Sequence, residues 1–314
     1  MTHAYMILAH NEFPLLTRLL SVLDFPDNSL FVHIDKKVKD DVFAQVKAEL
    51  EGAVKRASLA FTPRVEVSWG DFSMVQAELV LLREASKSYH DYCHLLSGVD
   101  LPLKPHSEIT RFFEENAGKE VLQGFCFPPR SAAQTASRIR LRYYYPFQHT
   151  VGHNYLRPLG LLQWLLLPLQ ALVGVNRLRR LPMAAGQPLD IYKGAQWFSV
   201  THDFALDLLE FYSHDENLKP YRHTMCADEI FVQMFAYHSK YKERIYMQKR
   251  RNDHLFPNNM RMVWFEKGLH GSPITFTTEE LPYLLQSNQL WARKFSFEKH
   301  PDVVDAIMER ISPQ

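Results

Sequence analysis

The feature that most constrains this fold is an alternation of two kinds of segment through the first half of the chain. Short apolar runs that end in polar residues are typical of buried strands. Longer segments with an apolar residue at every third or fourth position are typical of helices. The expected strands are Ala4–His10, Leu30–Asp35, Val65–Trp69, Tyr92–Leu96 and Glu120–Phe125, and the expected helices are Phe13–Leu23, Lys39–Glu51, Met74–Lys87 and Ser107–Glu115. This alternation of strands and helices predicts an α/β fold whose central, mostly parallel sheet is flanked by helices.

The second half of the chain is less regular. Arg138–Tyr145 alternates basic and apolar residues, which predicts a strand with its arginines on one face. Leu189–Val200 is expected to form two strands around a glycine turn, and Asp203–Tyr212 and Asp228–His238 are expected helices. No internal repeat and no Pro/Gly/Ser linker divides the chain. We therefore expect one domain, residues 1–314.

Composition and missing motifs exclude several classes of protein. Lys and Arg total 36 against 35 Asp and Glu, so no global positive field exists to hold a nucleic acid duplex. Neither GxGxxG nor GxxxxGK[ST] occurs, which leaves a Rossmann dinucleotide site or a P-loop unsupported. No Asp-x-Asp is present to clamp Mg²⁺ or Mn²⁺ on a diphosphate. The three cysteines form no CxxC pair and are expected to be small buried side chains.

The polar ends of the expected strands indicate a ligand site. In parallel α/β sheets, ligands bind beyond the carboxyl ends of the strands. Four such ends carry polar or aromatic residues, namely His10-Asn11, His33–Lys36, Trp69–Asp71 and Ser97–Asp100. Ordinary polar loops are the alternative, but four of them together favour a site.

Seven segments in a fixed order resemble one enzyme family. They are LAH near the start, VHIDKK, WGDFSMVQAEL, YCHLLSGVDLPL, KGAQWFSV, CADEIFVQ and the closing ARKF. In this order they resemble the core-2/I-branching enzyme family, which includes β-1,6-N-acetylglucosaminyltransferases and peptide O-xylosyltransferases. The resemblance runs from about Tyr5 to Phe295. It implies a GT-A-type fold, a UDP-sugar donor, inversion at the anomeric carbon and independence of any metal, in agreement with the missing Asp-x-Asp.

The resemblance also implies roles for residues of the reacting centre. Glu229 matches the family's catalytic glutamate, and an inverting transfer needs such a carboxylate to take the proton of the attacking hydroxyl. The neighbouring Asp228 is expected to cap the helix that follows. Lys294, in ARKF, matches the phosphate-binding lysine that meets the charge of the departing diphosphate. The adjacent Arg293 is a weaker candidate, since it points elsewhere if this stretch is extended.

One departure from the family pattern concerns a second basic residue. Relatives carry it in the strand before the final helix, whereas the corresponding stretch here, HGSPITFT at 270–277, has no Arg or Lys. His270 or Arg261 could substitute for it. The departure supports an alternative in which the chain is a catalytically idle glycan-binding protein of the same fold.

Further donor and acceptor residues are expected, each with a plainer alternative. Asp35 matches a position near the uridine, and Trp69 matches an aromatic beside the nucleotide. A strand-end turn and a buried core tryptophan are the alternatives. On the acceptor side we expect contributions from Asp100, Gln196, Trp197, Trp264 and Arg140. For these the alternatives are a turn aspartate, core tryptophans and a solvated basic face, and RNA binding through Arg138–Tyr145 is a weaker hypothesis.

One apolar segment invites a membrane hypothesis. Leu159–Val175 is interrupted only by Gln163, Pro168 and Gln170, and arginines flank it. It suits either an interfacial membrane helix or a buried helix hairpin, and both stay open. We expect a cytoplasmic protein, peripheral to the inner face of the membrane if the first holds, because no uninterrupted apolar run of about 20 residues occurs. The preferred function is transfer of GlcNAc, with xylose as the alternative sugar, from a UDP-sugar to a glycan or lipid-linked saccharide.

Overall fold

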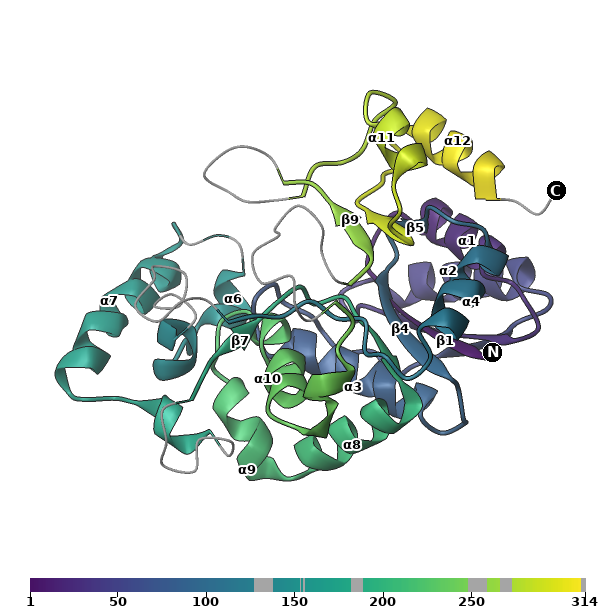
Figure 1. Cartoon of the computed structure of the whole chain (residues 1–314). Helices are drawn as coiled ribbons and strands as arrows, with labels where there is room; N and C mark the ends of the chain where they lie inside the picture. The colour runs from purple at the N-terminus through teal and green to yellow at the C-terminus, as the bar shows by residue number, and fades with distance from the viewer. Residues whose placement is uncertain are drawn as a thin grey trace.

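The computed structural model describes residues 1–126, 138–152, 154, 156–181, 189–247, 259–265 and 273–311. Its central sheet has the strand order β3-β2-β1-β4-β8 (Figure 1). These strands are β1 (His3–Ala9), β2 (Asn28–Ile34), β3 (Ser58–Phe61), β4 (Tyr92–Ser97) and β8 (Ser199–Thr201). The first four are parallel to one another, and β8 runs antiparallel to β4. The predicted α/β fold with a mostly parallel sheet is confirmed.

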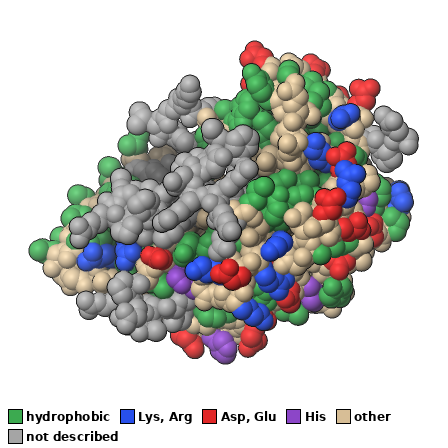
Figure 2. Space-filling model, in the orientation of Figure 1, with side chains coloured by type: hydrophobic (Ala, Val, Ile, Leu, Met, Phe, Trp, Pro, Cys, Tyr) green, Lys and Arg blue, Asp and Glu red, His purple; other side chains and the backbone are tan. Residues whose placement is uncertain are grey.

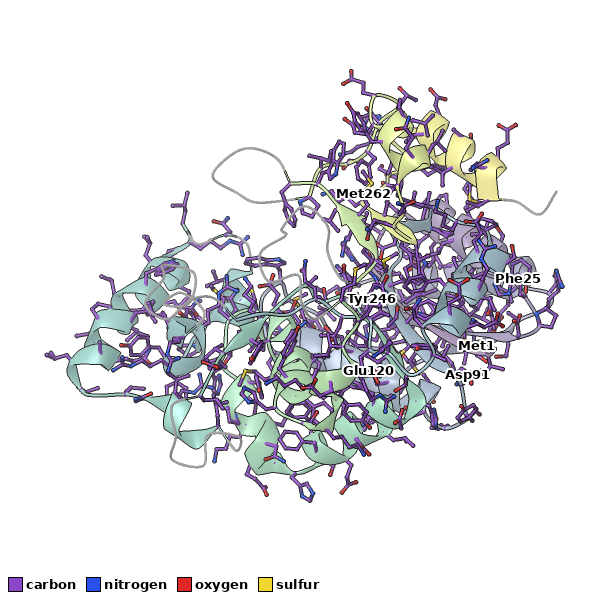
Figure 3. All side chains as sticks on the ribbon, viewed as in Figure 1. Met1, Phe25, Asp91, Glu120, Tyr246 and Met262 are labelled. Carbon is purple, nitrogen blue, oxygen red and sulfur yellow. The ribbon has the colours of Figure 1, made fainter. Side chains whose placement is uncertain are left out.

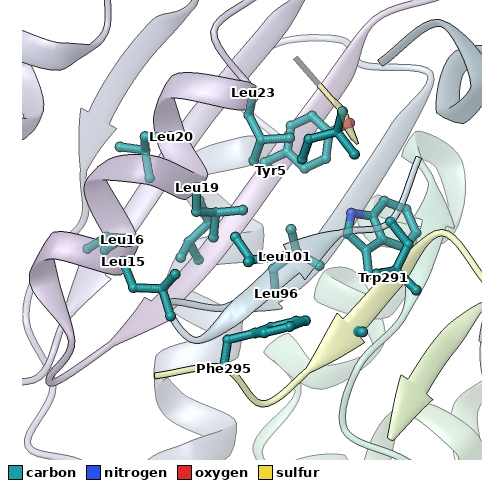
Figure 4. Close-up of a cluster of buried hydrophobic side chains, with 14 of the residues drawn as sticks. Tyr5, Leu15, Leu16, Leu19, Leu20, Leu23, Leu96, Leu101, Trp291 and Phe295 are labelled. Carbon is teal, nitrogen blue, oxygen red and sulfur yellow. The ribbon is translucent and has the colours of Figure 1, made fainter. Parts of the chain in front are cut away.

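Helices cover both faces of this sheet, so its strands are buried on both sides. Successive side chains of β1 point to opposite faces: Tyr5 and Ile7 enter one apolar core, and Ala4 and Met6 enter the other. The first core includes side chains of α1 (Phe13–Val22), α2 (Asp40–Ala53), α4 (His106–Glu115) and α12 (Pro301–Ile311). The second includes side chains of α3 (Ser73–Ala85), α8 (His202–Ser213) and α10 (Phe231–Tyr237). Figure 4 shows α1 leucines in the first core with Leu96, Leu101, Trp291 and Phe295.

A second, smaller sheet is built from segments far apart in the sequence. Strand β10 (Trp291–Arg293) lies between β5 (Asp100–Pro102), to which it is antiparallel, and β9 (Arg261–Val263), to which it is parallel. This sheet carries the residues that follow β4 against the C-terminal part of the chain, where α11 (Leu281–Gln286) lies. It therefore brings Asp100 opposite Arg293.

The other elements are short, apart from α7. They are β6 (Phe125–Cys126), β7 (Tyr192–Lys193), α6 (Gln148–Val151), α7 (Pro158–Leu172), η1 (Arg177–Arg180), α9 (Asp215–Leu218), η2 (Lys219–Tyr221), η3 (Ala227–Glu229) and η4 (Lys240–Arg244). Backbone hydrogen bonds join distant segments outside the sheets. One is donated by the Tyr246 amide to the Glu120 carbonyl at 2.9 Å, and Figure 3 labels both residues.

Three strand predictions were wrong. The third strand of the sheet is Ser58–Phe61 rather than Val65–Trp69. Residue 65 lies past the end of β2, where its amide bonds to the His33 imidazole and its carbonyl accepts from the Lys36 amide. Glu120–Phe125 forms only isolated bridges before the two-residue β6. Residues 138–142 are helical, so Arg140 lies on the opposite face from Arg138 and Arg142.

Helix α7 lies at the surface, at the left edge of Figure 1. The alternative of a buried helix hairpin for Leu159–Val175 is therefore wrong, since most apolar side chains of this helix are exposed. In the described ranges, no helix combines the length and apolar character that crossing a bilayer requires. Of the three cysteines, Cys93 and Cys226 are buried free thiols, as expected.

Candidate active site

A tight backbone junction holds Glu229 in place. Cys226 adopts a left-handed conformation with φ 53°, and its amide donates to the Gly70 carbonyl at 2.8 Å. The chain then makes the short 3₁₀ helix η3, which ends at Glu229. The Glu229 carbonyl accepts from the Gly194 amide at 2.9 Å. The backbone of the Asp-Glu pair is thus bonded on both sides to loops from other parts of the fold.

The Glu229 carboxylate is held by two cations through one oxygen. Its Oε2 lies 2.9 Å from Nη1 of Arg140 and 2.7 Å from Nζ of Lys193. The side chain stays one-third exposed. In the described part of the chain, no group donates to Oε1. The carboxylate is therefore fixed in position while one oxygen remains able to accept a proton from an incoming hydroxyl.

Two buried carboxyl groups lie beneath this site. Asp228 is buried, and among described residues no hydrogen bond reaches its Oδ1. Burial first, and then the charge of Glu229, raise the pKa of Asp228 to about 7. Glu78 is also buried, and burial together with the charge of Asp228 raises the pKa of its carboxyl group well above the ordinary value. The expectation that Asp228 caps a helix is wrong, because no side chain caps η3 or α10.

The segment from Lys193 to Trp197 connects the two halves of the site. The amide Nε2 of Gln196 donates to Oε1 of buried Glu78 at 2.8 Å. Trp197 is 9% exposed, and the guanidinium carbon of Arg293 lies 4.1 Å from its ring centroid. Four residues of extended chain span at most about 14 Å. Glu229, through Lys193, and Arg293, through Trp197, are therefore linked by one short segment of chain.

The second half of the site surrounds Arg293. Its Nε lies 3.5 Å from Oδ1 of Asp100, whose other oxygen accepts from the Ser97 amide at 2.9 Å. Burial raises the pKa of Asp100 and lowers that of Arg293. Asp100 thus occupies the turn after β4 and faces a cation. Arg293 lies in an extended strand and contacts Asp100 and Trp197, two other residues expected in the site, and its role at the donor stays a prediction.

The ends of β1 and β2 reach the same region. Burial lowers the pKa of His10, which follows β1, and Asp35 opposes this shift. The charges of Lys37 and Arg293 act in the same direction as burial. The His10 imidazole is therefore close enough to the end of β2 and to β10 for charges on both to change its pKa. Asp35 itself braces a turn, with Oδ1 accepting from the amides of Lys37 at 2.8 Å and Val67 at 3.4 Å.

Arg261 and His270 were the two residues expected to replace the missing basic residue near the diphosphate. Arg261 is buried, and it donates to the carbonyls of Asn259, Leu95 and Phe198 and to the hydroxyl of Ser199. Burial lowers the pKa of Arg261 to about 9. It cannot reach a phosphate, so that expectation is wrong. His270 lies outside the described residues.

Lys294 follows β10 directly. Its backbone is bonded to the 274–276 stretch, with its carbonyl accepting from the Phe276 amide at 3.0 Å. The residue is half-buried, and in the ranges described here no carboxylate pairs with its ammonium group. Its cation stands next in sequence to Arg293, which supplies a second positive charge at this end of the site.

The remaining expected aromatics differ in their surroundings. Trp69 is 38% exposed at a loop edge, where its carbonyl accepts from Nε2 of Gln148, so a core role is wrong. Trp264 packs on Phe276 and Tyr283, one residue beyond the β9 partner of Arg293. Its contacts belong to the C-terminal layer.

The arginines of residues 138–142 turn inward to three different partners. Arg138 donates to the Leu189 carbonyl, Arg140 to Glu229, and Arg142 to the Val175 carbonyl. The alternative of a solvated basic face is therefore wrong. RNA binding loses its main support, because no continuous basic surface is formed by these three side chains.

No metal centre is assembled by the described residues, among which no three His, Cys, Asp or Glu side chains gather as ligands would. The transfer without a metal that the resemblance implies stays a prediction.

Comparison with known proteins identifies the family of this chain. A family model described as Core-2/I-Branching enzyme matches residues 3–282. The chain belongs to the core-2/I-branching enzyme family. The mouse N-acetyllactosaminide β-1,6-N-acetylglucosaminyl-transferase is 28% identical over 140 residues, which are 42% of this chain and 33% of that protein. The human β-1,3-galactosyl-O-glycosyl-glycoprotein β-1,6-N-acetylglucosaminyltransferase is 32% identical over 124 residues, 38% of this chain and 28% of that protein. The matches thus span about a third of these curated relatives.

Sequence reasoning missed two residues of this candidate site. Lys193 stands in the quoted KGAQWFSV segment, but its pairing with Glu229 depends on a contact between distant segments. Glu78 lies in the quoted WGDFSMVQAEL block, on the buried face of α3. A carboxylate on the apolar face of a predicted helix was the signal that could have identified it.

Proposed function

We propose that this chain is an inverting glycosyltransferase of GT-A type that moves GlcNAc from UDP-GlcNAc to a hydroxyl of a glycan acceptor. The observation that carries the proposal is the Glu229 carboxylate, clamped by two cations at Oε2 with no donor from the described residues at Oε1. The names of the two relatives, both β-1,6-N-acetylglucosaminyltransferases, support GlcNAc as the sugar. Xylose is the alternative sugar.

In this mechanism Glu229 accepts the proton of the acceptor hydroxyl through Oε1. The hydroxyl oxygen attacks the anomeric carbon from the face opposite the diphosphate. The carbon–oxygen bond to the diphosphate breaks, and its electron pair leaves with UDP. A single displacement of this kind converts an α-linked donor into a β-linked product.

The donor end of the proposed site is cationic. Lys294 and Arg293 stabilise the negative charge that develops on the departing diphosphate, in the way that a metal ion does in other transferases. Asp100 holds Arg293 from behind, at 3.5 Å. Asp35 and Trp69 would contact the uridine. On this proposal the transfer needs no metal, and chelators leave the rate unchanged.

The acceptor would lie above Gln196 and Trp197, against Arg140. Trp264 and Asp100 stay predicted acceptor contacts. Both glycans and lipid-linked saccharides present the hydroxyl that this chemistry needs.

The test measures UDP release and sugar transfer from UDP-GlcNAc and UDP-xylose, with and without EDTA. Glu229→Gln should lower the transfer rate by about 10²- to 10⁴-fold, the typical contribution of a general base. Lys294→Ala should raise the donor KM and lower kcat, whereas the exposed Lys242→Ala is the matched control. UDP release that is equal in Glu229→Gln and the parent protein would refute the proposal. Glycan binding without any UDP release would instead identify the idle binding protein.

A further inference from the structure

Helix α7 presents its polar side chains to the protein and its apolar side chains to the outside. Buried Gln163 accepts from the Phe147 amide and donates to Oε1 of Gln148, both at 3.0 Å. Gln170, two turns further on, accepts from the Tyr144 amide at 2.7 Å and donates to its carbonyl at 3.0 Å. The polar side chains on the inner face of α7 thus hold the helix against residues 144–148.

The outer face of α7 is an apolar stripe. Leucines recur every fourth residue, and the exposed fractions of Leu161, Leu165 and Leu169 are 53%, 64% and 55%. Trp164 is 49% exposed and Leu172 84% exposed. No charged residue occurs within α7. In Figure 2 hydrophobic side chains reach the same left edge of the molecule that α7 forms in Figure 1. Soluble monomers seldom expose a contiguous surface of this kind.

The charge around α7 indicates what covers it. Between Glu120 and Asp190 the sequence contains eight arginines and no Asp or Glu. Arg157, just before the helix, is exposed. Arg177, just after it, is buried and donates to the carbonyls of Tyr143, Pro220 and His223, which fixes that end to the protein. An exposed apolar face with a tryptophan, with exposed Arg157 at its start and no acidic residue in this stretch of the sequence, complements anionic lipid headgroups over acyl chains.

We infer that α7 docks this protein on a membrane that contains anionic lipids, lying in the plane of the interface. Pairing with a second copy through the same face is the alternative, but this stretch of the second copy has no acidic residue to pair with exposed Arg157. The inference does not depend on the proposed function. Docking would place the site near the membrane, because residues 138–144 carry Arg140 to Glu229 and also hold α7 through Tyr144.

The experiment uses the full chain and sedimentation with vesicles of phosphatidylcholine alone or mixed with phosphatidylglycerol. The parent protein should bind the mixed vesicles, and added salt should weaken this binding. The double variant Leu165→Glu, Leu169→Glu should bind about tenfold more weakly or worse, because carboxylates do not enter the acyl region. Leu206→Glu is the matched control, since Leu206 is a 44% exposed leucine on α8.

Other outcomes overturn the inference. Equal vesicle binding by the parent and the double variant excludes α7 as the contact. If the parent protein does not bind vesicles and elutes as a dimer, and the double variant elutes as a monomer, then a second copy of the chain covers this face of α7. A circular dichroism spectrum and a urea midpoint equal to those of the parent show that the double variant is folded. This control does not use the proposed activity, so the result for α7 stands whatever the outcome of the UDP-release assay.

Discussion

The buried carboxyl group of Asp228 gives a quantitative prediction about stability and pH. Its pKa is about 7 in the folded protein against 3.8 in the unfolded chain. The folded state therefore holds this proton more tightly, so the stability associated with it is complete below pH 3.8 and is lost as the pH rises through 7. Each unit of difference corresponds to about 1.4 kcal/mol. Between pH 5 and pH 8 the loss amounts to about 3 kcal/mol.

Asp228→Asn replaces the carboxyl group with a neutral group of the same shape. We expect the stability of the variant relative to the parent to grow by about 3 kcal/mol from pH 5 to pH 8. The two proteins should be closest in stability below pH 3.8, where the parent carboxyl group is protonated in both the folded and the unfolded state. The assay is urea unfolding at pH 5, 6, 7 and 8, followed by circular dichroism. Asp41→Asn, at an exposed position of α2, is the control. If the Asp228→Asn and parent curves stay parallel from pH 5 to pH 8, Asp228 does not titrate in this range and the reasoning fails.

Three further substitutions test the packing around the site. A Cβ at Gly194 would lie 1.7 Å from the Gln123 carbonyl oxygen, so Gly194→Ala should lower the free energy of unfolding by about 3 kcal/mol, and an unchanged urea midpoint would contradict this. Arg261→Met leaves buried carbonyls without a donor and should lower the free energy of unfolding by about 3 kcal/mol. It should leave the KM for the donor unchanged, in contrast to Lys294→Ala, and a raised KM would show that Arg261 binds the phosphate. Thr201→Val removes the side-chain cap of α8 and should cost about 1–2 kcal/mol, seen as a lower melting temperature than that of the parent.

Much of the central fold could be predicted because its signals are local. The runs around β1, β2 and β4 are continuous apolar segments, and the helices between them repeat apolar residues at helical spacing. Val65–Trp69 alternates apolar and polar residues as a strand does, yet it lies beyond the end of β2, where its first residue bonds to the His33 imidazole and to the Lys36 amide. Residues 138–142 alternate as a strand does, but they are helical in the structure. Pairing is a property of the whole sheet, and no single segment encodes it.

The site could be predicted only where a motif marks it. Glu229, Lys294 and Trp197 lie in segments that resemble the family. The pairing of Glu229 with Lys193 and Arg140 joins three segments that are distant in the sequence, and the local pattern of none of them predicts it. Asp228 was expected to cap a helix from its sequence position alone. Its burial depends on packing around α3, which the sequence pattern did not specify.

The position of β1 has a consequence for biosynthesis. This strand is hydrogen-bonded to β2 on one side and to β4 on the other, so it is the middle strand of the central sheet. A ribosome makes β1 before either neighbour, and the second neighbour is complete only at Ser97. Until then its apolar residues have one partner strand, and the nascent chain needs protection from aggregation. Trimming residues 3–9 would remove the strand on which both neighbours align, so shortened versions of this protein should leave that end intact.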